Sequence, residues 1–486
     1  MAKKSKPAKK KAVMRKAPAK KAPVRKIVKK AAKPKGAPAQ KMTVDQLLKK
    51  AYEPARLAMI YHPFYEGKIE IVPKCAVRDF SDFAIWYTPG VAEPCKAINK
   101  DKELSYIHTN RWNTVAVISD GTRVLGLGDI GPEAGMPVME GKSLLFKYLG
   151  GVDAFPLCLG TKDPDKIIET VKILQPSLGG VNLEDISQPK CFYVLERLRE
   201  ECEIPVWHDD QQGTGTIVAA GAVNAAKFVG KKPSEMKVAY LGAGAANIAI
   251  SRIMQVSGFK WENMVMCDSK GTLHMGRCDE VKAEYKEKLF MCEHSNKENI
   301  VGGPADALRG ADMVVAASKP GPGTLKPEWI SGMADDSIVF ATANPIPEIW
   351  PWEALEAGAK VVATGRSDFP NQVNNSLGFP GIFRGTLDVK AKTISDTMCL
   401  AAVLEIAKTA EDNGLSENYI VPTMDEWEVF PREAAAVGMA AINEGIARVK
   451  ATRQELYEKA EEIIGRARRQ TKYLMKGKFI LPPPKA

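Results

Sequence analysis

Two pairs of acidic residues could bind a metal ion. Glu184-Asp185 follows the apolar run Gly-Gly-Val-Asn-Leu, and Asp209-Asp210 follows Pro-Val-Trp-His. Carboxylates at the ends of buried strands are costly to desolvate unless something pairs with them, and no Lys or Arg is adjacent to either pair. A hard divalent cation bound through oxygen, Mg²⁺ or Mn²⁺, would satisfy several carboxylates together.

The alternative interpretation is that both pairs are solvated loop residues, which is the usual role of an isolated Glu-Asp. Two pairs after strand-like runs, the second just before a Gly-Thr-Gly-Thr helix start at 213–216, favour the metal. Neighbouring strand residues point to opposite faces, so Glu184 and Asp185 can share an ion only where a strand runs into a loop. The pattern therefore predicts a metal site at such a strand end.

Two further residues are candidates for acid–base chemistry. Lys142 lies in a predicted helix over 136–147, after an expected strand and Gly-rich loop over 123–131. Cationic side chains are favoured at the C-terminal end of a helix, so a Lys near the start indicates a group directed into a cleft. Tyr87 precedes Thr-Pro-Gly and presents an aromatic hydroxyl on a loop, although a packing Tyr in a turn is the alternative.

The second half of the chain has the pattern of a dinucleotide-binding domain. Residues 237–250 predict a strand, a turn through Gly242 and Gly244, and a helix, and Asp268 ends the next strand. Glycines let the backbone approach a pyrophosphate, the helix N-terminus favours its charge, and the acid can accept a ribose hydroxyl. Asn247 replaces the usual third small residue. Further predicted strands at 312–317, 337–342 and 360–364 indicate an open parallel sheet.

The rest of the body is expected to support these elements. Residues 115–120 predict a buried strand of the first domain, and residues 43–58 a helix interrupted at Pro54. The chain after about residue 425 is expected to be helical, with a charged helix over 451–472. With 486 residues, two or three domains with ample core are expected.

The net charge of +11 comes from one end of the chain. Residues 1–41 contain 17 Lys and Arg and no acid, so the remaining chain has 52 basic and 58 acidic residues, a net of −6. This Lys/Ala/Pro-rich tail is predicted to be disordered, because it has few large apolar residues and repels itself. Contact with nucleic acid or another polyanion through counterion release, an inert solvating arm, and organelle targeting remain alternatives.

Cysteine and hydropathy patterns indicate the compartment. Nine cysteines, an odd number without a Cys-x-x-Cys, and five dispersed histidines favour free thiols in a reducing, intracellular environment. No apolar run approaches 18 residues, so no membrane span is expected. A cytoplasmic protein is predicted, with organelle targeting by the basic N-terminus as the alternative.

Seven motifs now occur in an order that is specific to one family. They are Tyr87-Thr-Pro-Gly-Val-Ala-Glu-Pro-Cys95, Arg123-Val-Leu-Gly-Leu-Gly-Asp-Ile-Gly131, Met136-Pro-Val-Met-Glu-Gly-Lys142, Gly180-Val-Asn-Leu-Glu-Asp185, His208-Asp-Asp-Gln-Gln-Gly-Thr214, Ala343-Asn344-Pro345 and Asn371-Gln-Val-Asn-Asn375-Ser-Leu-Gly-Phe-Pro380. With these the chain resembles a malic enzyme of the compact bacterial and archaeal kind, from about residue 73 to 387.

The resemblance implies a role for each matching residue. It makes Glu184, Asp185 and Asp210 the metal ligands, with Asp209 in hydrogen-bonding support. Lys142 becomes the base for the C2 hydroxyl of malate, and Tyr87 the acid for C3. Arg123 would hold a substrate carboxylate, assisted by Asn344 and Asn375. The implied cofactor-binding residues are Gly242, Gly244, Ala245, Ala246, Asn247, Asp268, Ser318 and Asn344. The chain departs from the family pattern at Gln212, where this subfamily often has His, and at Gly381.

The resemblance also implies an α/β architecture. An α/β substrate and metal domain over 42–208 would follow the tail, then a Rossmann-like, doubly wound parallel-sheet NAD(P) domain over 209–445, then a C-terminal helix and tail over 446–486. The implied partner is a second copy of the chain, in a homodimer or higher homo-oligomer.

The implied reaction is oxidative decarboxylation of (S)-malate to pyruvate and CO₂, with Mg²⁺ or Mn²⁺ and NAD or NADP. Asp268 favours a free ribose hydroxyl, whereas Ser269 and Lys270 could hold a 2′-phosphate, so the sequence leaves the cofactor open. Two alternatives remain. One is another enzyme on the same scaffold, malolactic or oxaloacetate-decarboxylating, and the other is a nucleic-acid-associated protein acting through its tail.

Overall fold

The computed structural model describes residues 44–282 and 286–485, so the predicted tail over 1–41 lies outside the described residues. The chain divides into two compact units, residues 1–54 and 55–486. The described part of the first unit is the beginning of α1 (Val44–Tyr65). The predicted interruption at Pro54 is wrong, because α1 continues through it; one proline removes one helical hydrogen bond, which a 22-residue helix tolerates.

The first sheet of the second unit is entirely parallel. Its order is β2-β1-β3-β4. In β1, which pairs with a strand on each side, every residue except the first is buried, as expected for a parallel strand covered on both faces. Its strands are β1 (Thr114–Ser119), β2 (Asp153–Cys158), β3 (Gly180–Leu183) and β4 (Val206–His208). The helices between them are α5 (Pro132–Gly150), α6 (Pro164–Leu174) and α7 (Lys190–Glu201).

The second sheet has the strand order of a doubly wound dinucleotide-binding fold. The order is β10-β9-β8-β5-β6-β7, with only the two-residue β7 antiparallel. Counted from β5, this is the order 6-5-4-1-2-3 of that fold with its third strand shortened. The strands are β5 (Val238–Leu241), β6 (Met264–Asp268), β7 (Gly271–Thr272), β8 (Met313–Ala316), β9 (Ile338–Ala341) and β10 (Val361–Thr364).

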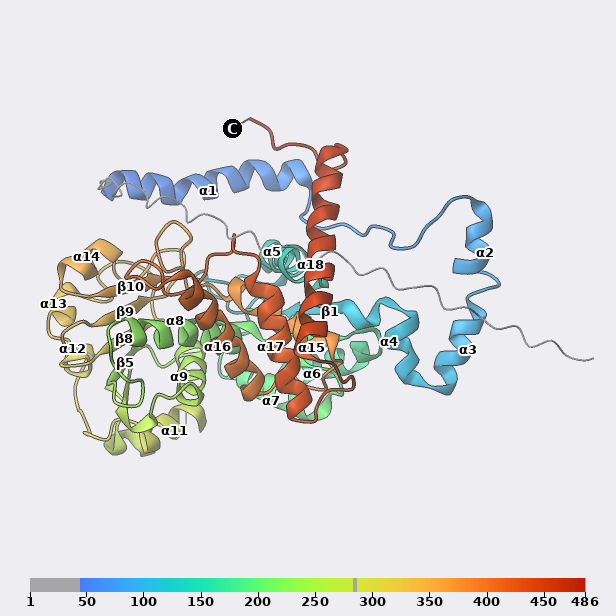
Figure 1. Ribbon diagram of the computed structural model, residues 1–486. Coiled ribbons are helices and arrows are strands. Elements are labelled where there is room, and N and C mark those ends of the chain that lie inside the picture. Colours follow the sequence, from blue (N-terminus) through green and yellow to red (C-terminus); the bar gives the residue numbers. More distant parts are fainter. Residues whose placement is uncertain (1–43, 283–285, 486) are drawn as a thin grey trace, which may run out of the picture. The chain divides into compact units, whose positions relative to one another are not determined.

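Alternate residues of these strands enter two separate cores. Val238 and Tyr240 pack into the larger core, whereas Ala239 and Leu241 pack into the smaller, as a two-residue period requires. Figure 1 shows helices on both faces. The larger core includes α8 (Thr214–Phe228) and α9 (Ala245–Val256), and the smaller includes α12 (Pro304–Leu308), α13 (Pro327–Ile330) and α14 (Pro351–Glu356). The predicted fold class is confirmed.

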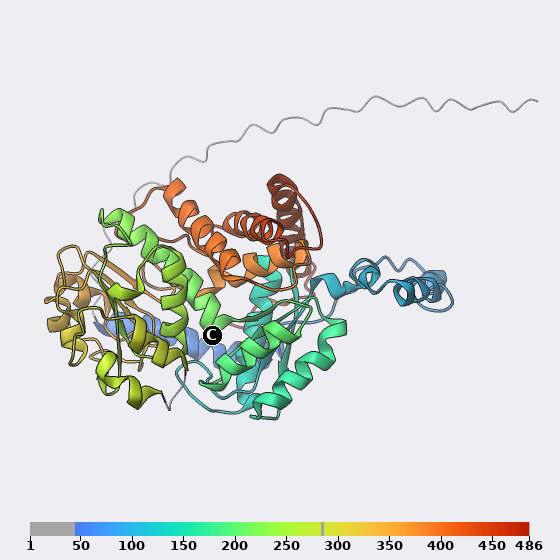
Figure 2. The ribbon, with the colours of Figure 1, turned by 90° about the horizontal axis from the view of Figure 1, so that it is seen from below.

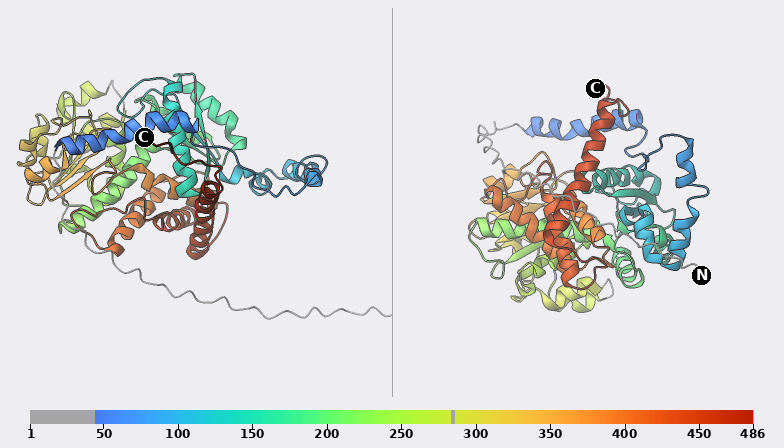
Figure 3. Two further views of the ribbon diagram at one scale, coloured as in Figure 1. Left: turned by 90° about the horizontal axis from the view of Figure 1, so that it is seen from above. Right: turned by 45° about the vertical axis from the view of Figure 1, so that its right-hand side comes forward.

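The C-terminal part is helical, as predicted. Figures 2 and 3 show its helices packed together. The charged helix predicted over 451–472 is α18, which begins after the capping residue Thr452. The helices are α15 (Phe379–Asp388), α16 (Asp396–Asn413), α17 (Val429–Asn443) and α18 (Arg453–Lys476).

Two shorter helices, α10 (Cys278–Val281) and α11 (Lys286–His294), follow β7. None of the helices in the described part of the chain is long and apolar enough to cross a membrane.

Residues 67–113, here called the arm, lead into the first sheet. Three short helices occur in the arm, α2 (Phe83–Trp86), α3 (Ala92–Lys100) and α4 (Ser105–His108). Figure 2 shows the part of the arm with α2 and α3 standing apart from both sheets. Large apolar side chains are exposed along it, including Phe80 at 90% and Ile85 at 57%. Such a run of exposed apolar surface is typical of an interface.

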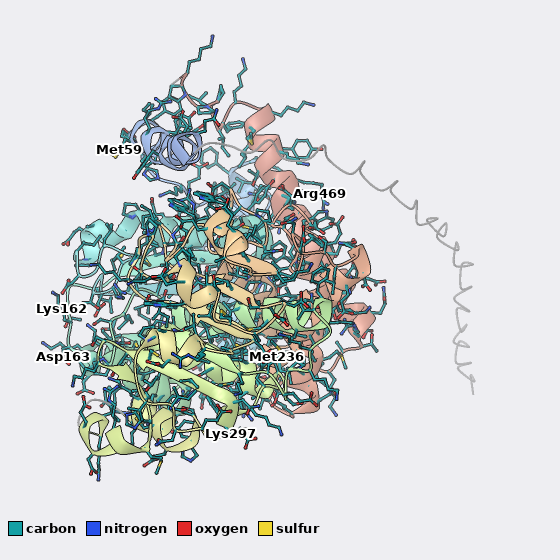
Figure 4. All side chains as sticks on the ribbon, turned by 90° about the vertical axis from the view of Figure 1, so that its left-hand side faces the viewer. Met59, Lys162, Asp163, Met236, Lys297 and Arg469 are labelled. Atoms are coloured by element: carbon teal, nitrogen blue, oxygen red, sulfur yellow. The ribbon has the colours of Figure 1, made fainter. Side chains whose placement is uncertain are left out.

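Two expectations around Lys142 are wrong in detail. Residues 123–131 form a loop with a single bridge between Val124 and Gly128 instead of a strand, because Leu125, Gly128 and Gly131 have positive φ and break the extended chain. The helix starts at Pro132, which is preorganised for a first helical turn, so Lys142 lies in the middle of α5. The next helix, α6, follows Lys162 and Asp163, both exposed on the surface (Figure 4).

Candidate active site

The fold brings both acidic pairs to one edge of the first sheet. Leu183 and His208 are the last paired residues of the neighbouring parallel strands β3 and β4. The residues that follow them, Glu184 and Asp209, therefore leave the sheet side by side. A wide π-helical turn over Asp209–Gly213 then leads into α8, and it carries Asp210 beside the loop that follows β3.

Lys142 is buried between carboxylates of both strands. Its Nζ lies 3.0 Å from Glu184 Oε1 and donates a close hydrogen bond to Asp209, while the ring of Phe379 covers it at 4.4 Å. Burial alone would lower the pKa of Lys142, but Asp209 and Glu184 outweigh that effect and hold the pKa above its ordinary value. Without a metal, Lys142 is therefore an ammonium group.

Neither acidic pair has a Lys or Arg next to it in the sequence, but the fold brings a cationic partner to both pairs. Lys142 comes from α5 and pairs with one acid of each pair. Among the described residues, Asp185 and Asp210 have no cationic side chain within ion-pair distance, apart from His208 Nδ1 at 3.6 Å from Asp210. Burial lowers the pKa of His208, so that imidazole is neutral and does not supply the missing charge.

Asp185 lies in an environment that disfavours its ionised form. Burial and then the charge of Asp210 raise the pKa of Asp185 to about 8. Its main-chain N–H donates to Asp210 Oδ2 at 2.8 Å, whereas its own Oδ2 is buried and has no hydrogen-bond partner among the described residues. Burial likewise raises the pKa of Glu184 well above its usual range, despite Lys142.

Three carboxylates with one buried, unpartnered oxygen fit a hard divalent cation. A cation bound there would remove the repulsion that raises the pKa of Asp185. As they stand, no group of three or more His, Cys, Asp or Glu side chains in the described ranges is arranged to hold a metal. The metal assignment of Glu184, Asp185 and Asp210 therefore stays a prediction that their chemistry supports.

The predicted substrate-binding residues border this cluster. The Arg123 N–H donates to Asp185 O at 3.0 Å, and its guanidinium acts to lower the pKa of Asp185. A Cβ built on Gly213 would meet Asp209 Oδ1 at 2.0 Å and Asn375 Cβ at 3.4 Å. The backbone oxygen of Asn344 would lie 2.6 Å from a Cβ on Gly126, in the Arg123 loop. All three predicted residues therefore adjoin the cluster or its loop.

Tyr87 is the predicted site residue that the chain does not bring to the cluster. It ends α2 in the arm and is 72% exposed. Its main-chain N–H bonds to Phe83 O within that helix. Its exposed position does not fit the alternative of a packed aromatic in a turn, and its role as the acid for C3 stays a prediction.

The glycine turn of the second domain packs closely against the chain that follows β8. Gly242 has a φ of 103°, and a Cβ there would lie 2.7 Å from Ala317 O and 3.2 Å from Ser318 Cβ. Gly244 caps α9, which begins with Ala245 and Ala246. Asn247, which replaces the usual small residue, is buried and donates to the carbonyls of Leu241 (3.0 Å) and Gly242 (2.8 Å). Its amide therefore braces the turn.

Asp268, the predicted ribose acceptor, is already fully paired. Its Oδ1 accepts from Arg277 Nη1 at 2.9 Å and from the Lys270 N–H at 2.8 Å. Its Oδ2 accepts from Arg277 Nη2 at 2.9 Å and lies 2.6 Å from Lys288 Nζ. Partial burial would raise the pKa of Asp268, but Arg277 and Lys288 hold that pKa well below its usual range.

Sequence reasoning missed several residues that position the cluster. Trp207 Nε1 donates to Asp209 Oδ1 at 3.0 Å, and Asn182 Nδ2 donates to Glu184 Oε2 at 2.8 Å. Each stands two residues before its acid, so the two-residue period of a strand could have placed it on the same face. No local signal marks Phe379. The departure at Gly381 is explained by buried Glu433, whose Oε2 would lie 2.0 Å from a Cβ there.

Comparison with protein families identifies the family to which the chain belongs. The family model of the malic enzyme N-terminal domain matches residues 66–199, and that of the malic enzyme NAD-binding domain matches residues 211–442. The chain belongs to the malic enzyme family. The resemblance identified from the seven motifs is confirmed.

Relatives and solved structures of the malic enzyme family match most of the chain. A bifunctional malic/malolactic enzyme of Bacillus subtilis is 49% identical over 409 residues, which cover 84% of this chain and 97% of that protein. An NAD-dependent malic enzyme of Geobacillus stearothermophilus is 49% identical over 385 residues, 79% of this chain and 78% of that protein. The crystal structure of an Entamoeba histolytica malic enzyme is 46% identical with a TM-score of 0.88, covering 92% and 93% of the two chains.

Proposed function

We propose that this chain oxidatively decarboxylates (S)-malate to pyruvate and CO₂ while reducing NAD(P)⁺. The observation that carries the proposal is the buried Lys142, held between Glu184 and Asp209 at the meeting point of two strand ends. Membership of the malic enzyme family supports the reaction, and the doubly wound second sheet supports the cofactor.

The metal is proposed to be Mg²⁺ or Mn²⁺, held by Glu184, Asp185 and Asp210. When bound, the cation supplies positive charge that lowers the pKa of a nearby ammonium and stabilises charge on the C2 oxygen of the substrate. The unpartnered Oδ2 of Asp185 supports this assignment.

Lys142 and Asp209 are proposed to handle the proton of the C2 hydroxyl. Lys142 passes a proton along its hydrogen bond to Asp209 and then accepts the hydroxyl proton, while the hydride leaves C2 for the nicotinamide. The resulting β-keto acid loses CO₂ to give an enolate. Arg123 binds a substrate carboxylate, and Asn344 and Asn375 orient the substrate.

Protonation of the enolate at C3 is proposed to use Tyr87 of a second copy. Tyr87 is 72% exposed on an arm with exposed apolar side chains, whereas Lys142 is buried in the cluster of its own chain. A homodimer that exchanges arms would bury that apolar surface and complete each site. The proposed oligomer therefore follows from the site being incomplete in one chain.

Mixing two inactive variants tests this exchange. In a heterodimer of Tyr87→Phe and Lys142→Ala chains, one site receives both native residues only if Tyr87 acts across the interface. Random reassociation should then recover roughly a quarter of wild-type activity. No recovery, with heterodimers shown to form, would place Tyr87 and Lys142 in the same chain's site.

The proposed reaction is tested by a steady-state assay with malate, Mn²⁺ and each cofactor. Pyruvate and NAD(P)H should form in equal amounts, and excess chelator should stop both. Malate consumption without NAD(P)H formation would exclude the proposed reaction and favour malolactic conversion, the second function that the name of the Bacillus subtilis relative includes.

We also propose domain boundaries, a role for the N-terminal tail and a location in the cell. Domain boundaries are proposed at 42–208, 209–445 and 446–486 after the tail over 1–41. For the tail, polyanion contact is proposed, supported by its 17 basic residues without an acid. A cytoplasmic location is proposed, with organelle targeting as the alternative.

A further inference from the structure

Gln188 contacts the first helix of the dinucleotide fold. Its Oε1 accepts the main-chain N–H of Ala245 at 2.6 Å, and a Cβ built on the preceding Gly244 would lie 3.3 Å from the same oxygen. A main-chain N–H only donates, so the atom facing it must be the amide oxygen. Gln188 therefore places an acceptor at the N-terminus of α9.

That N–H belongs to the part of α9 where a dinucleotide is bound. The first N–H groups of a helix have no partner inside the helix, and the helix end carries partial positive charge. In a doubly wound fold, the pyrophosphate binds at this first helix after the glycine turn. The amide oxygen of Gln188 lies where a pyrophosphate oxygen would be bound.

The loop that carries Gln188 is anchored to the proposed metal and substrate site. Gln188 lies three residues after Asp185, whose N–H donates to Asp210 Oδ2 at 2.8 Å. Between them, the Ser187 N–H donates to Thr122 Oγ1 at 3.0 Å. These two hydrogen bonds fix the backbone that precedes Gln188. The first domain therefore determines where the Gln188 side chain lies relative to Ala245.

We propose that Gln188 occupies the pyrophosphate position of the cofactor-free enzyme and leaves it when NAD(P) binds. This inference rests on the proposed function, which supplies the cofactor. The Gln188 oxygen and a pyrophosphate oxygen exclude each other at the Ala245 N–H. Cofactor binding therefore breaks one hydrogen bond before it forms its own, and Gln188 lowers the affinity for both cofactors.

Calorimetric titration of the metal-loaded enzyme with NAD⁺ and with NADP⁺ tests the inference. Gln188→Ala should bind both about two- to tenfold more tightly, the range for loss of one competing neutral hydrogen bond. The factor should be the same for both cofactors, since they share the pyrophosphate. Hydrogen exchange at the start of α9 should be faster in cofactor-free Gln188→Ala than in wild type.

Two further variants serve as controls. Gln175 Oε1 accepts the Glu203 N–H at 2.5 Å, the same type of bond at the opposite end of β3, so Gln175→Ala should leave both affinities unchanged. Gln188→Glu should weaken both, because a carboxylate is favoured at a helix N-terminus and repels the pyrophosphate.

The outcomes separate this inference from the proposed function. Wild-type enzyme that binds neither cofactor would overturn the proposed function and the inference with it. Wild type that binds while Gln188→Ala shows equal affinity would overturn the inference alone. Weaker binding by Gln188→Ala would also overturn it, because Gln188 would then be a ligand of the cofactor.

Discussion

An aspartate lies at or just after the end of each of the strands β3 and β6, and the two carboxylates differ in their partners. Asp268, the last residue of β6, is paired with Arg277 and Lys288, which hold its pKa well below the usual range. Asp185 after β3 has one oxygen without a partner, and burial raises its pKa to about 8. The chain pairs both oxygens of Asp268 internally, whereas Oδ2 of Asp185 has no hydrogen-bond partner among the described residues. The same residue type at equivalent strand ends thus serves as structural support in one sheet and as a candidate metal ligand in the other.

Removing the ammonium group of Lys142, which pairs with the acids at the ends of β3 and β4, should have the largest effect. Lys142→Ala should lower the rate of malate oxidation on the order of 10²–10⁴-fold, the range for one positioned acid–base group. The measurement is kcat for NAD(P)H formation at saturating Mn²⁺. Lys162→Ala, which removes an exposed lysine paired with Asp129, is the control and should retain wild-type kcat. Equal rates for the two variants would remove Lys142 from the chemistry.

Removing the guanidinium group of Arg277, which pairs with Asp268 at the end of β6, should instead change the preference between NAD⁺ and NADP⁺. Arg277→Ala frees carboxylate lone pairs on Asp268, which can then accept a ribose hydroxyl and repel a 2′-phosphate. Affinity for NADP⁺ relative to NAD⁺ should fall about tenfold. Calorimetric dissociation constants measure this, with Arg309→Ala as control because Arg309 pairs with Asp306 on the surface. An unchanged ratio would show that Asp268 does not face the ribose.

The two aspartates should also give opposite pH dependences of stability in the metal-free protein. The raised pKa of Asp185 means that its stabilisation is present below its unfolded pKa and is lost as pH rises toward 8, by at most about 1.4 kcal/mol per pH unit. The lowered pKa of Asp268 means the reverse, with stability lost as pH falls below its unfolded value.

Denaturant unfolding between pH 5 and 8 measures the contribution of Asp185, because that of Asp268 changes only at lower pH. Asp185→Asn should flatten the decline of stability toward pH 8, and Asp268→Asn should leave that slope unchanged. Saturating Mg²⁺ should flatten the wild-type slope as Asp185→Asn does. A wild-type slope that neither Mg²⁺ nor Asp185→Asn alters would contradict the assignment of Asp185.

The smallest effect is expected from removing the tail, which belongs to neither strand end. Deleting residues 2–40 should leave kcat and the unfolding midpoint nearly unchanged. It should abolish any salt-sensitive DNA or RNA binding, because the remaining body is net negative. Filter binding at low and high salt measures this. Retained binding by the truncated protein would show that the body carries its own nucleic-acid surface.

Sequence reasoning predicted the parts of the site that depend on local pattern. The predicted strand ends are observed at Glu184 and Asp209, because strands, glycine turns and the acids that follow them are coded within a few residues. The pairing of Lys142 was not predictable, since it depends on how α5 packs against β3 and β4, which begin 38 and 64 residues after Lys142. The pairing of Asp268 with Arg277 depends on the short antiparallel strand β7, which reverses the chain after β6. No local sequence pattern predicts that reversal.

The position of Tyr87 marks the other limit of the sequence argument. The motif around Tyr87 is intact, but the motif does not specify which copy of the chain the hydroxyl serves. That depends on which surface covers the exposed apolar residues of the arm, and the residues around Tyr87 do not code for that contact.

Direct titration with Mn²⁺ tests the central contrast between the two strand ends most directly. Electron paramagnetic resonance of free Mn²⁺ should show about one tight site per wild-type chain. Asp210→Asn should lose most of that affinity because it removes one proposed ligand, whereas Asp268→Asn should bind Mn²⁺ as wild type does. Wild-type affinity in Asp210→Asn, or loss of the site in Asp268→Asn, would contradict the assignment of the β3 end as the metal site.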